Sequence, residues 1–118
     1  MNIYRWLSPD SAIDELAAVT DKAIYISEAG ADSFNINSNS ENESQQAQAT
    51  EIILNAIIAK SDLCIGVTLF EFCDEWWKAG NPNQQDPGGF SNAIPYDNFA
   101  NEEYWGIVTR DREPKLSY

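Results

Sequence analysis

Two apolar, strand-like runs joined by one long amphipathic helix form the middle of this sequence. Residues 23–27 are centred on the β-branched and aromatic side chains of Ile24, Tyr25 and Ile26 and lead directly into Glu28, and residues 63–72 are apolar apart from Gly66, Thr68 and Glu71. Between them, apolar side chains in residues 45–60 recur at the three- and four-residue spacings of a helical stripe. Strands joined by a helix favour parallel pairing, so we expect an α/β fold in which residues 63–72 are covered on both faces.

The flanking segments extend the same alternation. Residues 2–6 resemble the end of a strand, and Ser8-Pro9-Asp10 predicts the start of a short helix running to about Val19. Residues 35–46 are polar enough to predict a mobile surface loop, and residues 79–101 predict a long loop rich in Gly, Pro, Asn and Asp. Residues 104–108 predict a last extended piece. Two and a half strand–helix units would leave an open sheet, which predicts that further strands lie in a preceding part of the polypeptide.

Composition narrows the classes of partner. The formal net charge is −12 in 118 residues, which disfavours nucleic acid and anionic membrane surfaces and leaves neutral ligands such as sugars compatible. The chain has no His, so acid–base chemistry must use carboxylates or Tyr, and we expect no cofactor. Cys64 and Cys73 lie nine residues apart around one strand, which predicts two unpaired thiols. We expect a soluble chain, since neither a signal peptide nor a membrane span is visible; the compartment stays unknown.

Acidic and aromatic residues gather where the strands are predicted to end. Glu28 ends the first strand, and the second is followed by a group with the same character: Glu71, Asp74, Glu75, Trp76 and Trp77. Because ligands of parallel α/β folds bind beyond the carboxyl ends of the strands, these residues predict a pocket mouth. A loop-bracing role for Glu28 and core packing for the Trp pair are the alternatives. Glu71, Asp74 and Glu75 lack the spacing of a calcium loop, so we expect no metal.

Three segments resemble family 2 glycoside hydrolases, the β-galactosidase and β-glucuronidase group of clan A. The segment 26–32, Ile-Ser-Glu-Ala-Gly-Ala-Asp, resembles their strand seven, and residues 66–77 resemble their strand eight. Residues 101–115, with Gly106-Ile107 and then Asp111-Arg112-Glu113-Pro114, are similar to the segment that closes their barrel. The resemblance implies a partial (β/α)8 TIM barrel: strands six to eight, intervening helices and a long C-terminal loop, so that residues 1–118 are a C-terminal fragment of a catalytic domain.

The function implied by this resemblance is retaining hydrolysis of a glycosidic bond in an oligo- or polysaccharide. Glu28 matches the family's nucleophile, while Glu71, Asp74, Glu75, Trp76 and Trp77 match the rim that lines the sugar subsite. The family's acid/base Glu lies at strand four, which places it in the absent N-terminal barrel half and predicts that the chain alone is inactive. Two alternatives remain: a non-catalytic carbohydrate-binding or interaction module, and a transglycosylase such as a β-glucanosyltransferase.

Overall fold

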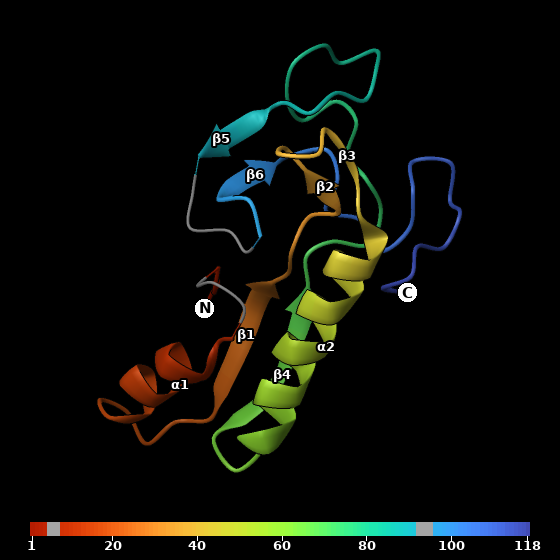
Figure 1. Ribbon diagram of the computed structural model, residues 1–118. Helices are drawn as coiled ribbons and strands as arrows, with labels where there is room; N and C mark the ends of the chain where they lie inside the picture. Colours follow the sequence, from red (N-terminus) through yellow and green to blue (C-terminus); the bar gives the residue numbers. More distant parts are fainter. Residues whose placement is uncertain (5–7, 92–95) are drawn as a thin grey trace.

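The chain forms a small mixed α/β structure built on one pair of parallel strands. The computed structural model describes residues 1–4, 8–91 and 96–118. Helices α1 (Asp10–Ala17) and α2 (Glu43–Ala59) accompany strands β1 (Ile24–Ala29) and β4 (Cys64–Leu69) at one end of the molecule (Figure 1). Two short antiparallel pairs, β2 (Phe34–Asn35) with β3 (Ser40–Glu41) and β5 (Gly89–Ser91) with β6 (Phe99–Asn101), occupy the other end. No helix in the described ranges is long and apolar enough to cross a membrane.

The central pairing confirms the predicted strand–helix–strand unit. β1 and β4 run parallel, with Ile24 opposite Cys64 and Ala29 opposite Leu69, and α2 is the crossover between them. On the other edge of β1, the amide of Ile3 donates to the carbonyl of Glu28 at 2.8 Å, so the N-terminal segment also lies beside this strand. Arg5 and Trp6, which the sequence placed in that segment, lie outside the described residues. The carboxyl ends of these neighbours therefore meet at one edge, where Glu28 lies.

The core covers only one face of this sheet. The prediction that residues 63–72 are covered on both faces was therefore wrong. Ile24 and Ile26 point to the same face because strand side chains alternate, and they pack with Ile13 of α1 and with Ile53 and Ile57 of α2. The opposite face is open: Tyr25 is 48% exposed and Ile65 is 71% exposed. An apolar run alone does not distinguish a strand covered on both faces from one covered on a single face. The described strands do not by themselves show a partial barrel.

Both helices lie near their predicted positions. α2 begins at Glu43 after Asn42, whose side chain accepts a hydrogen bond from the amide of Gln45 at 3.2 Å. α1 begins at Asp10, with Pro9 preceding the first helical residue and the Ser8 hydroxyl accepting from the Asp10 amide at 3.3 Å. It ends at Ala17 rather than at Val19, which is 79% exposed and adds nothing to the core.

The two segments predicted as irregular loops each contain a hairpin. β2 and β3 lie within residues 34–41, where the sequence predicted a mobile polar loop, and β5 and β6 lie within the predicted 79–101 loop. Strands of two or three residues are too short to show an alternating pattern. The first hairpin is fixed by tertiary contacts, since Phe34 packs on Tyr104 with ring centroids 4.8 Å apart.

The two cysteines are free thiols, as predicted. Cys64 is buried in the core beside β1, and Cys73 is partly buried after β4. The Cys73 sulfur lies 3.3 Å from the carbonyl oxygen of Thr109. Each thiol therefore fills a local space in the fold.

Candidate functional site

The side chain of Glu28 lines a hollow at the carboxyl end of the parallel strands. The hollow has a volume of about 200 Å³, and its described lining is Tyr4, Glu28, Phe70, Lys78, Phe90, Ala100, Glu102 and Trp105. Glu28 is placed by its position near the end of β1, and its Oε2 accepts a hydrogen bond from the Tyr4 hydroxyl at 3.1 Å. A partly buried carboxylate oriented by a phenol is therefore available to a ligand in this hollow.

Aromatic rings build the base of the hollow. Tyr4, Phe70 and Trp105 meet edge to face, with centroid separations of 5.3 Å for Tyr4–Trp105 and 5.8 Å for Phe70–Trp105. Trp105 is only 4% exposed, and its indole N–H has no hydrogen-bond partner among the described residues. Such rings offer apolar faces to a sugar.

Lys78 lies in the same hollow between two carboxylates. Its ammonium nitrogen is 3.2 Å from Glu75 Oε2 and 3.7 Å from Glu102 Oε2, and it stands 4.2 Å from the centroid of the Phe70 ring. The Lys78 side chain is 28% exposed, which reduces the screening of these charges by water. The cation is thus held by partners within the chain.

Glu71 is the second residue after the end of β4. Burial raises the pKa of Glu71 to about 8, the negative charge of Glu75 adds to this rise, and the Lys78 ammonium opposes it. Burial also raises the pKa of Tyr4, and the hydrogen bond to Glu28 acts in the same direction because it favours the phenol. Tyr4 therefore remains a hydrogen-bond donor to Glu28 throughout the neutral range.

Asp74, which the sequence placed at the sugar subsite, is instead buried under this end of the fold. It is 1% exposed, and its carboxylate accepts from Lys115 Nζ at 2.8 Å, the Gly106 amide at 2.9 Å and the Gln85 side-chain amide at 3.1 Å. Burial raises the pKa of Asp74, and these donors act against that rise. The carboxylate holds the segments around it together, because its oxygens are occupied by protein donors.

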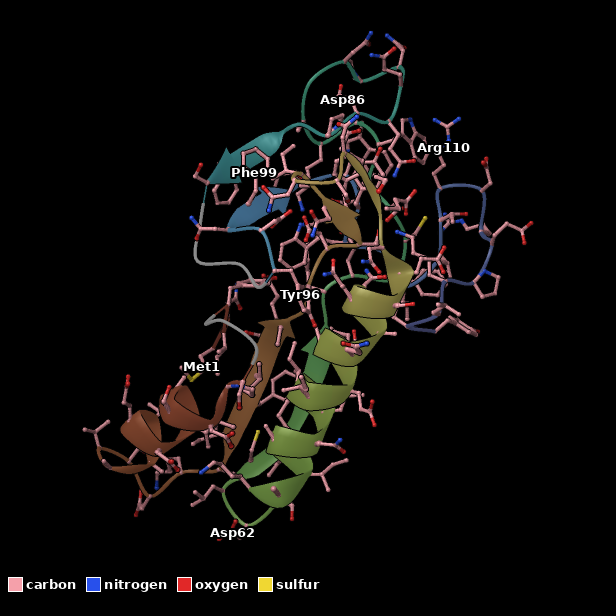
Figure 2. The ribbon with its side chains drawn as sticks, in the orientation of Figure 1. Met1, Asp62, Asp86, Tyr96, Phe99 and Arg110 are labelled. Atoms are coloured by element: carbon pink, nitrogen blue, oxygen red, sulfur yellow. The ribbon has the colours of Figure 1, made fainter. Side chains whose placement is uncertain are left out.

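The tryptophan pair is also placed apart from Glu28. Trp76 and Trp77 pack edge to face at 4.6 Å, and Trp77 is 50% exposed. Trp76 lines a second hollow of about 270 Å³ with Asn83, Arg110 and Asp111. Figure 2 shows Arg110 on one side of this end of the molecule and Phe99, the neighbour of the lining residue Ala100, on the other. Glu28 and Trp76 were expected to share one acidic and aromatic pocket, but they line different hollows.

Sequence reasoning missed most of the residues that meet Glu28. Tyr4 could have been found, because it lies in the segment 2–6, which resembles the end of a strand, and the neighbouring Ile3 pairs with Glu28. Trp105 is buried and also lines the hollow, a double role that the sequence does not reveal. Glu103 is fully buried and accepts from the amides of Ala79 and Asp86 at 3.1 and 2.7 Å, although a Glu-Glu pair is typical of a solvated surface.

The described residues offer no evident metal centre. They include no group of three or more His, Cys, Asp or Glu side chains that could hold an ion. The groups that the first hollow offers among the described residues are a carboxylate nucleophile or base, a phenol donor, an ammonium cation and aromatic faces.

Comparison with solved structures relates this fold to glycoside hydrolases. A GH2 β-galacturonidase from Eisenbergiella tayi, bound to galacturonate, matches 92% of the chain at 25% identity with a TM-score of 0.59. The β-D-glucuronidase of Dictyoglomus thermophilum matches 92% at 20% identity and a TM-score of 0.56, and BpGH50 matches 99% at 14% and 0.57. No protein-family model matches the chain, and no curated protein matches it.

These matches cover only part of the larger enzymes. The chain spans 19% of the Eisenbergiella tayi chain, 16% of the Dictyoglomus thermophilum chain and 22% of BpGH50. The chain therefore has the fold of a segment of GH2 and GH50 glycoside hydrolases.

Proposed function

We propose that this chain is the C-terminal part of the catalytic domain of a retaining glycoside hydrolase, folded as part of a (β/α)8 barrel. The observation that carries the proposal is the setting of Glu28. This carboxylate ends a parallel strand, accepts a hydrogen bond from Tyr4 and opens into a hollow with an aromatic base. A site of this kind suits a nucleophile that must approach a sugar ring from one face.

In the proposed reaction, a Glu28 oxygen attacks the anomeric carbon while the bond from that carbon to the departing oxygen breaks. The product is a glycosyl ester of Glu28, and water then cleaves the ester and restores the carboxylate. The proton for the departing oxygen comes from a second carboxyl group, which we place in a preceding part of the polypeptide. Tyr4 orients Glu28, and the Phe70 and Trp105 rings receive the apolar face of the sugar.

The remaining predicted sugar contacts take different parts in this proposal. Glu71 and Glu75 act from beside the hollow through Lys78, and Asp74 supports it by holding the Gly106 amide next to Trp105. Trp76 and the exposed Trp77 contact a sugar unit further from the scissile bond, since the Trp76 hollow also offers Asn83 and Arg110 as hydrogen-bonding groups. The substrate is an oligo- or polysaccharide long enough to reach both places.

A fluorinated glycoside with an activated leaving group tests the nucleophile directly. We would incubate the chain with 2,4-dinitrophenyl 2-deoxy-2-fluoro-β-glucoside and its galactoside, because dinitrophenolate departs without a proton from an acid catalyst. The expected result is one fluoroglycosyl group on the peptide containing Glu28, located by mass spectrometry. Glu28→Gln should abolish the label, and Glu51→Gln, which changes an exposed carboxylate on α2, should leave it unchanged.

The other outcomes separate the alternatives. Labelling at a carboxylate other than Glu28 would remove it as the nucleophile. If the glycoside binds but leaves no label, both in the chain alone and in the chain combined with a preceding barrel half, the carbohydrate-binding module is favoured. A labelled enzyme that passes its sugar to an added glucoside faster than to water would identify a transglycosylase, since both reactions share the same ester.

A further inference from the structure

The first hollow contains more negative than positive charge. Among its described lining residues, Glu28 and Glu102 are carboxylates and Lys78 is the single cation. Glu75 adds a third carboxylate within 3.2 Å of that cation. Among the described residues, a ligand that enters the hollow therefore meets more acidic than basic groups, in a chain whose formal net charge is −12.

The cation is not free to receive an anionic ligand. Lys78 Nζ lies close to Glu75 and Glu102 and over the face of Phe70, so its charge is offset on three sides. A sugar carboxylate that approached Lys78 would have to displace one of these partners and would stand beside the other. Like charges brought together in a partly buried site oppose binding.

A neutral sugar meets none of this opposition. Its hydroxyl groups can donate to Glu102 and Glu28, and its ring can lie against Phe70 or Phe90. Carboxylates that repel an anion are good acceptors for hydroxyl hydrogens.

From this arrangement we infer that the site selects neutral hexopyranosides and rejects uronic acid glycosides. The inference rests on the proposed function, since it concerns the ligand of the same hollow. It also separates this chain from solved structures of similar fold, which are a β-galacturonidase and a β-glucuronidase. Shared fold does not fix the charge of the substrate, because that charge is read by individual side chains.

Matched pairs of ligands test the inference. Phenyl β-galactoside and phenyl β-galacturonide differ only at C6, as do the corresponding glucoside and glucuronide, and their affinities for the whole chain can be measured by ligand-observed NMR titration. We expect the neutral member of at least one pair to bind about tenfold or more tightly at low ionic strength. Added salt should narrow this difference because it screens the acidic groups.

A charge-neutralising variant sharpens the test. Glu75→Gln combined with Glu102→Gln removes the partners of Lys78 while keeping side chains of similar size. This variant should bind the uronide about tenfold more tightly than the wild-type chain does, with a smaller change for the neutral sugar. Lys78→Met in the same background should cancel the gain, and circular dichroism would verify that each variant is folded.

The contrary outcomes are distinct. If the wild-type chain prefers the uronide and Lys78→Met removes that preference, the inferred selectivity is wrong while a sugar site at Glu28 stands. Equal affinity for both members of a pair would also overturn the selectivity. If neither member of either pair binds, the proposed function fails, and the selectivity fails with it.

Discussion

Asp32 holds its proton more tightly in the folded chain than in the unfolded chain. It follows β1 closely, is 7% exposed and accepts a hydrogen bond from the Asn101 amide at 2.5 Å. Burial raises the pKa of Asp32 from 3.8 to about 8, and the negative charge of Asp97 adds to the rise, while the bond from Asn101 opposes it. Well below pH 3.8 Asp32 is protonated in both states, so its titration then adds no pH dependence to the folding stability.

This residue predicts a loss of stability as the solution becomes less acidic. Between the two pKa values the unfolded chain releases a proton that the folded chain keeps, so the free energy of unfolding falls by up to about 1.4 kcal/mol per pH unit. Asp32→Asn keeps an oxygen acceptor for Asn101 and removes the titration. We expect the variant to lose less stability between about pH 5 and about pH 7 than the wild-type chain, measured by urea denaturation.

Equal pH dependence in the two proteins would show that Asp32 is not the group responsible. Glu71, whose pKa is also raised to about 8, acts in the same direction and should leave part of the dependence in the variant. Glu71→Gln in the Asp32→Asn background distinguishes these two contributions.

Individual residues differed in how far the sequence could place them. Glu28 was predictable because a β-branched run ends at it, and a side chain at the end of a parallel strand reaches the ligand edge. Lys78 carried no such signal, since it follows an irregular turn and meets Glu102 only after residues 79–101 fold back. Its position depends on a contact between distant segments.

At the scale of elements, one side chain of α2 connects the helix to the site. Gln46 is 1% exposed, and its side-chain N–H groups lie within hydrogen-bond distance of the carbonyl oxygens of Ala31, Trp105 and Gly106, at 3.1 to 3.3 Å. It therefore connects the first turns of α2 to the segment after β1 and to the base of the hollow. Loss of this group would remove the donor to the carbonyl oxygens of Ala31 and Gly106, whereas the Trp105 carbonyl would keep the Glu71 amide at 3.2 Å.

Gln46→Ala is accordingly expected to destabilise the chain by roughly 2–4 kcal/mol, measured as a lower urea midpoint. Gln48→Ala provides the matched control because Gln48 lies on the same helix with an exposed side chain, and it should change stability by less than about 0.5 kcal/mol. Similar losses in both variants would contradict the role of the buried bonds, because Gln→Ala by itself raises helix propensity at both positions.

Across the whole molecule, the C-terminal segment is tied to both halves of the chain. The structure is elongated, with extents of 46 × 26 × 23 Å, and Lys115 is buried. Its ammonium contacts Asp74 at 2.8 Å, Ser33 at 3.0 Å and Glu41 at 3.5 Å, with none of its side chain exposed. One buried cation therefore joins the C-terminal segment to Ser33, Glu41 and Asp74.

Lys115→Met should destabilise the fold by roughly 3–5 kcal/mol, because Asp74 would keep a buried charge without its partner. Lys22→Met changes an exposed lysine whose side chain is 84% accessible, and it should have little effect. Adding Asp74→Asn to Lys115→Met should recover part of the loss, as a double-mutant cycle of thermal unfolding would reveal. Strict additivity of the two substitutions would contradict the buried pair.

The sequence by itself determined the features that depend on local pattern. The β1–α2–β4 unit, the start of α1 and the position of Glu28 at a strand end follow from residue spacing and caps, which act over a few neighbouring residues. The short hairpins, the open face of the sheet, and the placing of Asp74 and Trp76 away from Glu28 were decided only by tertiary structure. These features arise from contacts between segments far apart in the chain, such as Phe34 with Tyr104 and Asp74 with Lys115, and no local pattern encodes such a contact.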